Sequence, residues 1–356
     1  MKKLFAILLA AVMAFSVAAC GNSETETTAA PAVTETEMAS EATEATEANV
    51  AAEATETTAA EPVTITVGVP KAPPALPVLH MIEDNLLGEN VTINLDVWVG
   101  PEQLIAMVQD NSHDFFAFPL TVVAKLYNTG VDVRLMNVNT WGVTYFMTND
   151  PDFKTWEDLK GKTVYVPLQS SPPDALTQYF LDEAGLEVGK DVEIIYATTP
   201  EVSALLASGE AMYATLIEPQ CTIAMSKNEN LIRALSFEEE WQRTTGTETM
   251  IPNAGFGTTQ RVLDAQPELA AAFQRAYAES VQWVLDNPQE AGELAAKYLE
   301  LPAPMIAKAI PNMGMCFKTP QDAQEELNTF YQLLNDFDAK MIGGKLPDEG
   351  MFYVGQ

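Results

Sequence analysis

The chain has 356 residues, a formal net charge of −31 and 47% hydrophobic residues. This length and hydrophobic content allow one large or two medium globular domains. The strong negative charge disfavours nucleic acid and anionic lipid headgroups as partners. Only two histidines, His80 and His113, and three cysteines are present, which is too few for a His-rich metal site or a disulfide framework. We therefore expect no metal, no cofactor and no nucleic acid.

The N-terminal residues predict export. Met1-Lys2-Lys3 is a short basic start, an apolar run follows, and Val17-Ala18-Ala19-Cys20 is a small-residue cleavage site ending in cysteine. The pattern resembles a bacterial lipoprotein signal. The resemblance implies that residues 1–19 are a signal peptide, that cleavage precedes Cys20, and that Cys20 is lipidated. We expect a protein anchored by lipid at the extracytoplasmic face of the cell membrane.

Residues 20–62 consist mostly of Thr, Ala and Glu, with ten glutamates and no Lys, Arg or aromatic residue. Such a segment cannot bury enough apolar surface to fold, so we predict a disordered tether. About −23 of the net charge remains for residues 63–356.

From residue 63 onward, short β-rich runs alternate with helical stretches, which is typical of an α/β fold with mostly parallel strands. The first block predicts, in chain order, a strand at 64–69, a helix at 75–87, a strand at 91–99, a helix at 102–109, a strand at 114–118, a helix at 120–128, and strands at 131–138 and 143–148.

Asp150-Pro151 opens a second alternating block. Its predicted strands cover 163–166, 192–196, 211–217 and 231–235, and its predicted helices cover 172–184, 201–208 and 219–227. A strand at 247–256 then leads back, and the chain is mainly helical from 267, with the clearest amphipathic helix at 267–286.

Two α/β blocks followed by a return predict two lobes joined by two crossing segments, near Thr148 and near Asn253. Residues 63–148 and 254–356 would form lobe 1, and residues 149–253 would form lobe 2. Ligands of open α/β sheets bind beyond the carboxyl ends of the strands, and here those ends can face each other across a cleft.

The stretch from Asp158 to Ala184 predicts a strand that leads directly into a helix. Ser170 and Ser171 occupy the N-cap position, and Pro172 and Pro173 suit the first helical turn. Free backbone N–H groups at such a helix start can hold an oxygen-rich ligand group. The alternative is an ordinary capped helix without a ligand.

Several runs in residues 156–219 also carry a family resemblance. They are 156–164 (WEDLKGKTV), 181–186 (LDEAGL), 190–192 (KDV), 204–211 (ALLASGEA) and 217–219 (IEP). The region is similar to the second lobe of type II periplasmic binding proteins of ABC importers, in the nitrate, sulfonate, taurine and thiamine-precursor branch called NMT1-like or SsuA/TauA-like. Met212-Tyr213 departs from the family's usual Asp-Ala, and Asn111 to Asp114 replaces a glycine-led turn.

This resemblance implies an α/β Venus-flytrap fold with two hinge crossings. It also implies a receptor that captures a small-molecule solute and passes it to ABC permease subunits in the membrane. We expect a monomer, and we expect no enzymatic activity because two distant histidines do not support a triad and no G-x-S-x-G motif occurs. Closure requires ligand contacts to both lobes, because the closed state must bind better than the open one.

Candidate ligand-binding residues therefore lie near strand ends in both lobes. They are Lys71, Trp98, Phe118 and Trp141 in the first lobe, Gln169, Ser170, Ser171, Asp174 and Glu218 in the second, and Asn253 on the returning segment. The aromatic residues could sandwich a flat ring, and the alternative for each is a core position.

Charge indicates the class of ligand. Lys71 is the only basic residue in these loops, and no Arg offers a bidentate clamp for an anion. This favours a neutral or weakly cationic heteroaromatic solute, such as an aminopyrimidine, that bonds to Glu218. Glu218 could instead cap the helix that begins at Pro219. A sulfonate, taurine or nitrate anion is the alternative ligand.

An enzyme and an adhesion protein are alternatives to a receptor. Some NMT1-like proteins are enzymes that make the thiamine pyrimidine with a cysteine-rich cluster for iron, and this chain lacks such a cluster. A surface adhesion protein would suit the tether but leaves the two-lobed pattern unexplained. Cys221 and Cys316 are expected to be free thiols, with a bridge between them as the alternative.

Overall fold

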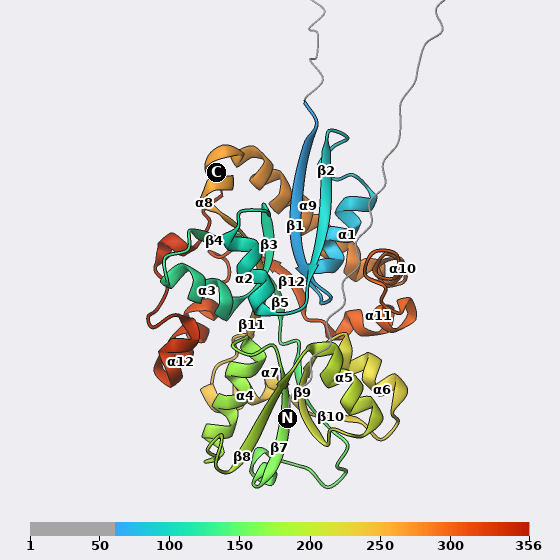
Figure 1. Ribbon diagram of the computed structural model, residues 1–356, viewed down its shortest axis with the longest axis vertical. Helices are drawn as coiled ribbons and strands as arrows, with labels where there is room; N and C mark the ends of the chain where they lie inside the picture. Colours follow the sequence, from blue (N-terminus) through green and yellow to red (C-terminus); the bar gives the residue numbers. More distant parts are fainter. Residues whose placement is uncertain (1–60, 356) are drawn as a thin grey trace, which may run out of the picture. The chain divides into compact units, whose positions relative to one another are not determined.

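The structure is a computed structural model and describes residues 61–355. The predicted signal peptide, Cys20 and nearly all of the predicted tether lie outside these residues. Within them, the chain forms two β-sheets with helices on both faces, which confirms the expected two-lobed α/β fold class (Figure 1).

The first sheet has seven strands in the order β12-β5-β11-β3-β1-β2, with β4 paired to β11. Its strands are β1 (Val63–Pro70), β2 (Val91–Trp98), β3 (Phe115–Pro119), β4 (Val133–Leu135), β5 (Val138–Trp141), β11 (Pro252–Thr259) and β12 (Met315–Lys318). β1 runs parallel to β2 and β3, and β11 runs antiparallel to β3, β4 and β5. We call this sheet and its helices the first lobe.

The second sheet has five strands in the order β10-β6-β9-β7-β8. They are β6 (Thr144–Thr148), β7 (Lys162–Pro167), β8 (Val192–Ala197), β9 (Tyr213–Ile217) and β10 (Ile232–Ser236). β7 runs parallel to β8 and β9, whereas β6 runs antiparallel to β9 and β10. This sheet and its helices form the second lobe.

The helices connect and cover these strands. In the first lobe they are α1 (Ala75–Glu83), α2 (Pro101–Gln109), α3 (Leu120–Asn128), α8 (Gln260–Ala265), α9 (Pro267–Asp286), α10 (Pro288–Leu299), α11 (Ala303–Ala309) and α12 (Gln324–Asp338). In the second they are α4 (Pro172–Glu183), α5 (Thr199–Ser208), α6 (Gln220–Lys227) and α7 (Phe237–Thr245). None of the helices in residues 61–355 is long and apolar enough to span a bilayer.

The central strand β3 shows why both faces of the first sheet carry helices. All five of its residues are buried, so the strand needs cover on both sides. Phe115 and Ala117 belong to the core shared with α1 and α9, and Phe115 stacks on Phe273 of α9 at 4.1 Å between ring centroids. Phe116 and Phe118 belong to the core shared with α2 and α3.

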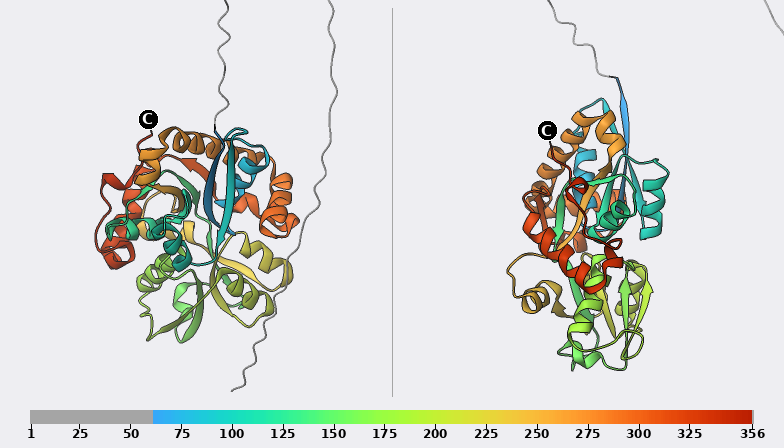
Figure 2. Two further views of the ribbon diagram at one scale, coloured as in Figure 1. Left: turned by 45° about the horizontal axis from the view of Figure 1, so that its top comes forward. Right: turned by 90° about the vertical axis from the view of Figure 1, so that its left-hand side faces the viewer.

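Contacts flank the boundary between the lobes on two sides. On one side, Tyr179 of α4 meets Phe337 of α12 edge to face at 5.8 Å between ring centroids. The ring centroids of Trp241 in α7 and Phe330 in α12 are 6.3 Å apart. On the other, α6 packs against α11. The two sheets lie on opposite sides of this boundary (Figure 2).

The first crossing between the lobes lies earlier than predicted. β5 ends at Trp141 in the first sheet and β6 begins at Thr144 in the second, so the chain crosses at Gly142 and Val143 rather than near Thr148. β6 pairs with β9 and β10, and that pairing places residues 144–148 in the second lobe. The return crossing leads into β11 at Pro252, close to the predicted Asn253.

Other predicted elements differ in detail. The strand predicted at 131–138 is divided into β4 and β5, because Asn137 turns out of the ladder and its side-chain oxygen accepts a hydrogen bond from the Phe256 N–H at 3.1 Å. The strand predicted at 247–256 begins only at Pro252. Helix α7 and strand β12 were not predicted.

Candidate functional site

Strand ends from both sheets converge between the lobes. In the first sheet, β1, β2 and β3 end at Pro70, Trp98 and Pro119, and the antiparallel strand β11 starts beside Pro119. In the second, β7 and β9 end at Pro167 and Ile217. This is the arrangement that the strand-end rule predicts for a ligand site in an α/β protein.

A first hollow of about 40 Å³ lies where these ends meet. Its first-lobe lining includes Phe118, Pro119, Thr140 and Asn253, and its second-lobe lining includes Leu168 and Ile217. We call it the Phe118 hollow. Most of its lining is apolar, and Thr140 and Asn253 supply the polar side chains.

A second hollow of about 50 Å³ adjoins the first. The two share five lining residues, namely Pro70, Ala72, Trp98, Leu168 and Ile217. The second hollow adds Lys71, Val99, Thr199, Pro200 and Gln220, and we call it the Lys71 hollow. A water molecule takes up roughly 30 Å³ in the liquid, so a ring-sized solute can enter only if the lobes move apart.

Trp98 borders both hollows. Its side chain is only 2% exposed, and its Nε1–H has no hydrogen-bond partner among the described residues. A buried N–H group without a partner loses its hydration and gains nothing in return. The indole therefore offers a donor to an acceptor atom placed between the lobes.

The loop after β7 has a constrained backbone. Leu168 and Ser170 have φ angles of 55° and 67°, in the left-handed region that non-glycine residues rarely adopt. Ser170 is also tied to the first lobe, because the Thr121 hydroxyl donates a 2.7 Å hydrogen bond to its carbonyl oxygen. Residues held in this way are enriched at ligand sites and switches.

The start of α4 is not free for a ligand as the sequence predicted. Ser171 is the N-cap residue but makes no side-chain capping bond. Instead, Asp174 accepts hydrogen bonds from the Ser170 N–H at 2.7 Å, from Gln178 at 2.8 Å and from the Tyr196 hydroxyl at 3.0 Å. Burial raises the pKa of the Asp174 carboxyl, and these hydrogen bonds oppose the rise. The protein's own carboxylate thus occupies the helix start.

Glu218 is likewise committed within the second lobe. It is fully buried, pairs with the Arg233 guanidinium, and accepts hydrogen bonds from the Thr222 N–H and hydroxyl at 3.1 and 3.2 Å. Burial raises the pKa of Glu218, and the charge of Arg233 opposes that rise. The predicted bond from Glu218 to a ligand is therefore replaced by an internal ion pair, and the N-cap residue of α6 is Pro219.

Trp141 lies outside the lining of both hollows. Its Nε1–H donates to the Cys316 carbonyl oxygen at 2.7 Å, and the Lys318 ammonium lies 4.9 Å from its ring centroid. Trp141 therefore occupies a core position, which was the alternative prediction for this residue, because β12 covers it. Cys316 is exposed and Cys221 is buried, and both are free thiols.

Gln169 and Ser170 border a different hollow of about 260 Å³, formed against α2 and α3 of the first lobe. The ten predicted site residues therefore divide into three groups. Lys71, Trp98, Phe118 and Asn253 line the hollows between the sheets. Gln169, Ser170, Ser171 and Asp174 belong to the loop and helix start beside them. Trp141 and Glu218 are engaged elsewhere.

Leu168, Ile217, Thr140, Thr199 and Gln220 also line the hollows and were not predicted. Four of them lie at or close after a strand end, and Thr140 lies one residue before the end of β5, so the strand-end rule could have found them. The predicted residues were charged, aromatic or polar side chains, and the aliphatic residues Leu168 and Ile217 carry no such signal in the sequence.

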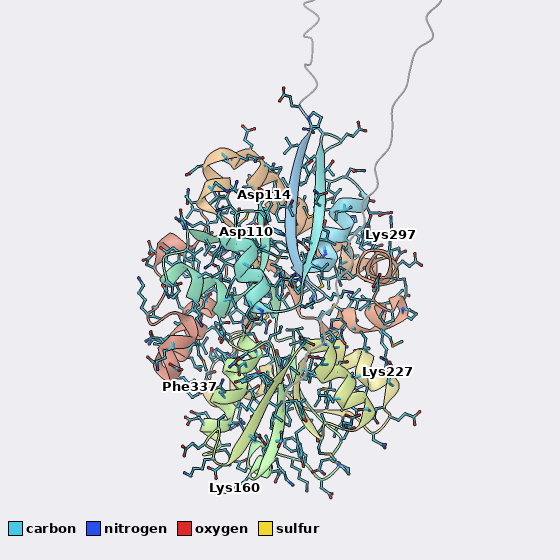
Figure 3. All side chains as sticks on the ribbon, in the orientation of Figure 1. Asp110, Asp114, Lys160, Lys227, Lys297 and Phe337 are labelled. Atoms are coloured by element: carbon cyan, nitrogen blue, oxygen red, sulfur yellow. The ribbon has the colours of Figure 1, made fainter. Side chains whose placement is uncertain are left out.

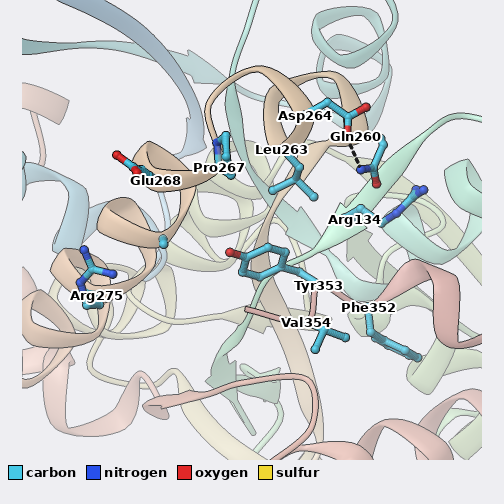
Figure 4. Close-up of a pocket in the computed structure, with 11 residues that line it drawn as sticks. Arg134, Gln260, Leu263, Asp264, Pro267, Glu268, Arg275, Phe352, Tyr353 and Val354 are labelled. Atoms are coloured by element: carbon cyan, nitrogen blue, oxygen red, sulfur yellow. Dashed lines mark hydrogen bonds between the residues drawn. The ribbon is translucent and has the colours of Figure 1, made fainter. Parts of the chain in front are cut away.

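A wider hollow of about 680 Å³ lies on the first lobe alone. It is bordered by α8, the start of α9 and the C-terminal segment, with Arg134 and Arg275 on opposite sides of Tyr353 (Figure 4). No second-lobe residue lines it, so lobe closure cannot act on a molecule bound there. The hollow of about 260 Å³ is shared by both lobes, but helices α2 and α3 rather than strand ends form most of its lining. The two hollows between the sheets, where the strand ends meet, are therefore the candidate site.

Comparison with solved structures shows the same fold in binding proteins. An ABC transporter protein from Parabacteroides distasonis superposes with a TM-score of 0.69 at 21% identity, covering 82% of this chain and 99% of that one. The periplasmic aliphatic sulphonate binding protein SsuA from Escherichia coli superposes with a TM-score of 0.67 at 18% identity, covering 83% and 94%.

Sequence comparison adds one relative and one family. The "Putative binding protein YtlA" of Bacillus subtilis (strain 168) is 26% identical over 146 residues, which span 41% of this chain and 41% of that protein. A family model described as "NMT1/THI5 like" matches residues 90–291, more than half of the chain, including parts of both lobes. The chain belongs to the NMT1/THI5-like family.

Proposed function

We propose that this protein is the extracytoplasmic solute-binding component of an ABC importer, which captures a small solute between its lobes and delivers it to permease subunits. The observation that carries the proposal is the convergence of strand ends from both sheets on two adjoining hollows. A solute held there contacts both lobes, and ligand contacts to both lobes are what drive closure. The relatives' names, which describe binding proteins, also support it.

For the ligand, we favour a small heteroaromatic, similar to a thiamine precursor. Trp98 and Phe118 offer aromatic surface, and Asn253 and Thr140 offer a few polar groups on an otherwise apolar lining. Ligand sites commonly combine an apolar wall with a few orienting polar groups. A sulfonate, taurine or nitrate anion is the second candidate, supported by Lys71 and by the sulphonate-binding neighbour.

An NMT1-like enzyme of pyrimidine synthesis is the alternative from another class. Among residues 61–355, no group of three or more His, Cys, Asp and Glu side chains could hold a metal ion. His113 does lie between Ser112 and Asp96, at 2.6 and 3.1 Å, but none of the three borders the hollows between the sheets. Reversible recovery of an unchanged solute would support binding, and release of a product would support the enzyme.

The anchor belongs to the same proposal. We infer a signal peptide at residues 1–19, lipidation of Cys20 and a tether to residue 62 that holds the folded part near its permease. Labelling with a fatty-acid analogue should mark the wild-type chain and not the Cys20→Ser variant. An unlabelled wild-type chain that fractionates away from membranes would contradict the anchor and leave solute binding untouched.

Native mass spectrometry of the purified chain tests the binding proposal. We expect one small solute per chain, and small-angle scattering should show a smaller radius of gyration once solute is added to solute-free protein. A co-purified solute without a ring would contradict the heteroaromatic class but keep the receptor. Failure of every ring-containing and sulfonate solute to bind or to compact the chain would contradict the receptor itself.

A further inference from the structure

The Lys71 hollow has an excess of hydrogen-bond donors. Lys71 is half-buried and forms no ion pair or hydrogen bond within residues 61–355. The Trp98 Nε1–H is buried and has no hydrogen-bond partner among the described residues, and the Gln220 amide, which can donate, also lines the hollow. Donors without acceptors are costly when buried, so the hollow is incomplete without an acceptor-bearing group.

Two helix starts add to this polarity. Thr199 is the first residue of α5 and Gln220 is the first residue of α6, and both line the hollow. Backbone N–H groups and the positive ends of the helix dipoles favour a negative charge near these positions. Exposed Glu201 offsets part of this effect at α5, since its carboxylate accepts hydrogen bonds from the Thr198 N–H and hydroxyl. Buried Glu218 offsets part of it at α6, since it accepts a hydrogen bond from the Thr222 N–H in the first turn.

The carboxylates that the sequence placed at the ligand are engaged elsewhere. Glu218 pairs with Arg233, and Asp174 is held by Ser170, Gln178 and Tyr196. Neither carboxylate lines the Lys71 hollow. Among residues 61–355, the only charged side chain that lines the two hollows is therefore a cation, Lys71, although the whole chain has a net charge of −31.

We propose that the Lys71 hollow is a subsite for a small anionic arm of the ligand, a carboxylate or an oxyanion of similar size, while the ligand's ring lies in the Phe118 hollow. This inference rests on the proposed solute-binding function and narrows its ligand class to ring compounds that carry an acidic substituent.

A matched pair of probes tests the arm. The probes are 4-amino-5-hydroxymethyl-2-methylpyrimidine and the corresponding 5-carboxylate, titrated calorimetrically into the purified chain. We expect the carboxylate to bind at least tenfold more tightly, and Lys71→Met to reduce that preference to less than threefold. Lys227→Met is the control, because it removes the same charge from an exposed site at the far end of α6 (Figure 3). A preference for the hydroxymethyl compound, or one that survives Lys71→Met, would overturn the subsite.

A second measurement does not depend on the ring. Formate at constant ionic strength, with chloride as the reference salt, should raise the melting temperature of the wild type and of Lys227→Met but not of Lys71→Met. If neither pyrimidine binds but formate acts through Lys71, the ring class is wrong and the anionic subsite stands. If formate has no such effect, the subsite is wrong, whatever the outcome for solute binding.

Discussion

The Thr121 hydroxyl of α3 donates a hydrogen bond of 2.7 Å to the carbonyl oxygen of Ser170, and so joins the first lobe directly to the loop after β7 in the second. Thr121 is fully buried and Ser170 is in the left-handed region. The bond can exist only while the lobes are together, so it contributes to the closed state and not to the open one.

Thr121→Val should therefore weaken closure. The variant keeps the shape of the side chain and removes a hydrogen bond worth about 1 kcal/mol, which corresponds to a roughly fivefold weaker apparent affinity. Stopped-flow fluorescence should show that most of the loss lies in faster solute release. Thr129→Val is the control, since the Thr129 hydroxyl bonds only to carbonyl oxygens within its own helix region, at 2.8 and 3.1 Å. Equal affinities for the two variants would refute the role of Thr121.

Substitution of Trp98 should change solute affinity, whereas substitution of Trp141 should change stability. Trp98→Phe keeps an aromatic ring and removes the unpartnered Nε1–H donor that borders both hollows. We expect roughly tenfold weaker solute binding, in line with a lost hydrogen bond to a polar or charged acceptor. Trp141→Phe removes the bond to the Cys316 carbonyl oxygen and should leave affinity unchanged while lowering stability by about 1 kcal/mol. Calorimetry measures the solute affinity of both variants, and urea unfolding measures their stability. The reverse pattern would show that the site lies at Trp141.

The Glu218–Arg233 pair should be a determinant of stability. Glu218 has no exposed surface, and Glu218→Gln leaves the Arg233 guanidinium without its charged partner. Arg233 is 26% exposed and keeps its hydrogen bond to Thr222, so the loss should be that of a hydrogen bond to a charged group, about 1.5–3 kcal/mol, and urea unfolding should shift to a lower midpoint. Glu187→Gln is the matched control, because the Glu187–Lys190 pair is exposed and such pairs contribute about 0–1 kcal/mol. An unchanged midpoint for Glu218→Gln would contradict the buried ion pair.

Glu238 should make stability depend on pH. It lies beside both crossings: Glu238 accepts a hydrogen bond from the Ile251 N–H at 3.1 Å, and a Cβ added at Gly142 would approach the same carboxyl to 2.6 Å. Burial raises the pKa of the Glu238 carboxyl above the ordinary value of 4.5, and the Ile251 N–H opposes the rise. The uncharged carboxyl therefore fits the folded state better. The stability that it contributes is complete below pH 4.5 and is lost as the pH rises through the folded-state pKa.

Glu238→Gln stays uncharged at every pH. Its melting temperature relative to the wild type should therefore increase between pH 4.5 and pH 7. Glu239→Gln, an exposed neighbour in the same helical turn, should show no such trend. A difference between Glu238→Gln and the wild type that does not change with pH would mean that the Glu238 carboxyl is not perturbed by folding.

Much of the fold could be predicted because local patterns agree with the tertiary structure. The helix predicted at 120–128 matches α3 residue for residue, and the helix predicted at 267–286 matches α9. The predicted elements were wrong where contacts between residues distant in the sequence determine the local structure. Asn137 interrupts a β-rich run because it bonds to Phe256 in β11, 119 residues away, and no local pattern reports that partner.

The candidate site was predicted less completely for the same reason. Strand ends could be located, so Trp98, Phe118, Lys71 and Asn253 were predicted as site residues from their positions near strand ends and from their aromatic, basic or polar side chains. The sequence did not show which side chains pair with one another in the fold. In the sequence, Glu218 and Asp174 are carboxylates near a ligand site, but in the fold Arg233 of β10 pairs with Glu218 and the Tyr196 hydroxyl of β8 donates to Asp174.

The sequence by itself determined the alternation of strands and helices, the two blocks and the export pattern, because these depend on the order of residues along the chain. Only the tertiary structure decided which charges are neutralised inside the protein and which remain for a ligand. A buried charge is stabilised by whatever lies within a few ångströms of it, and residues that are distant in the sequence supply those neighbours.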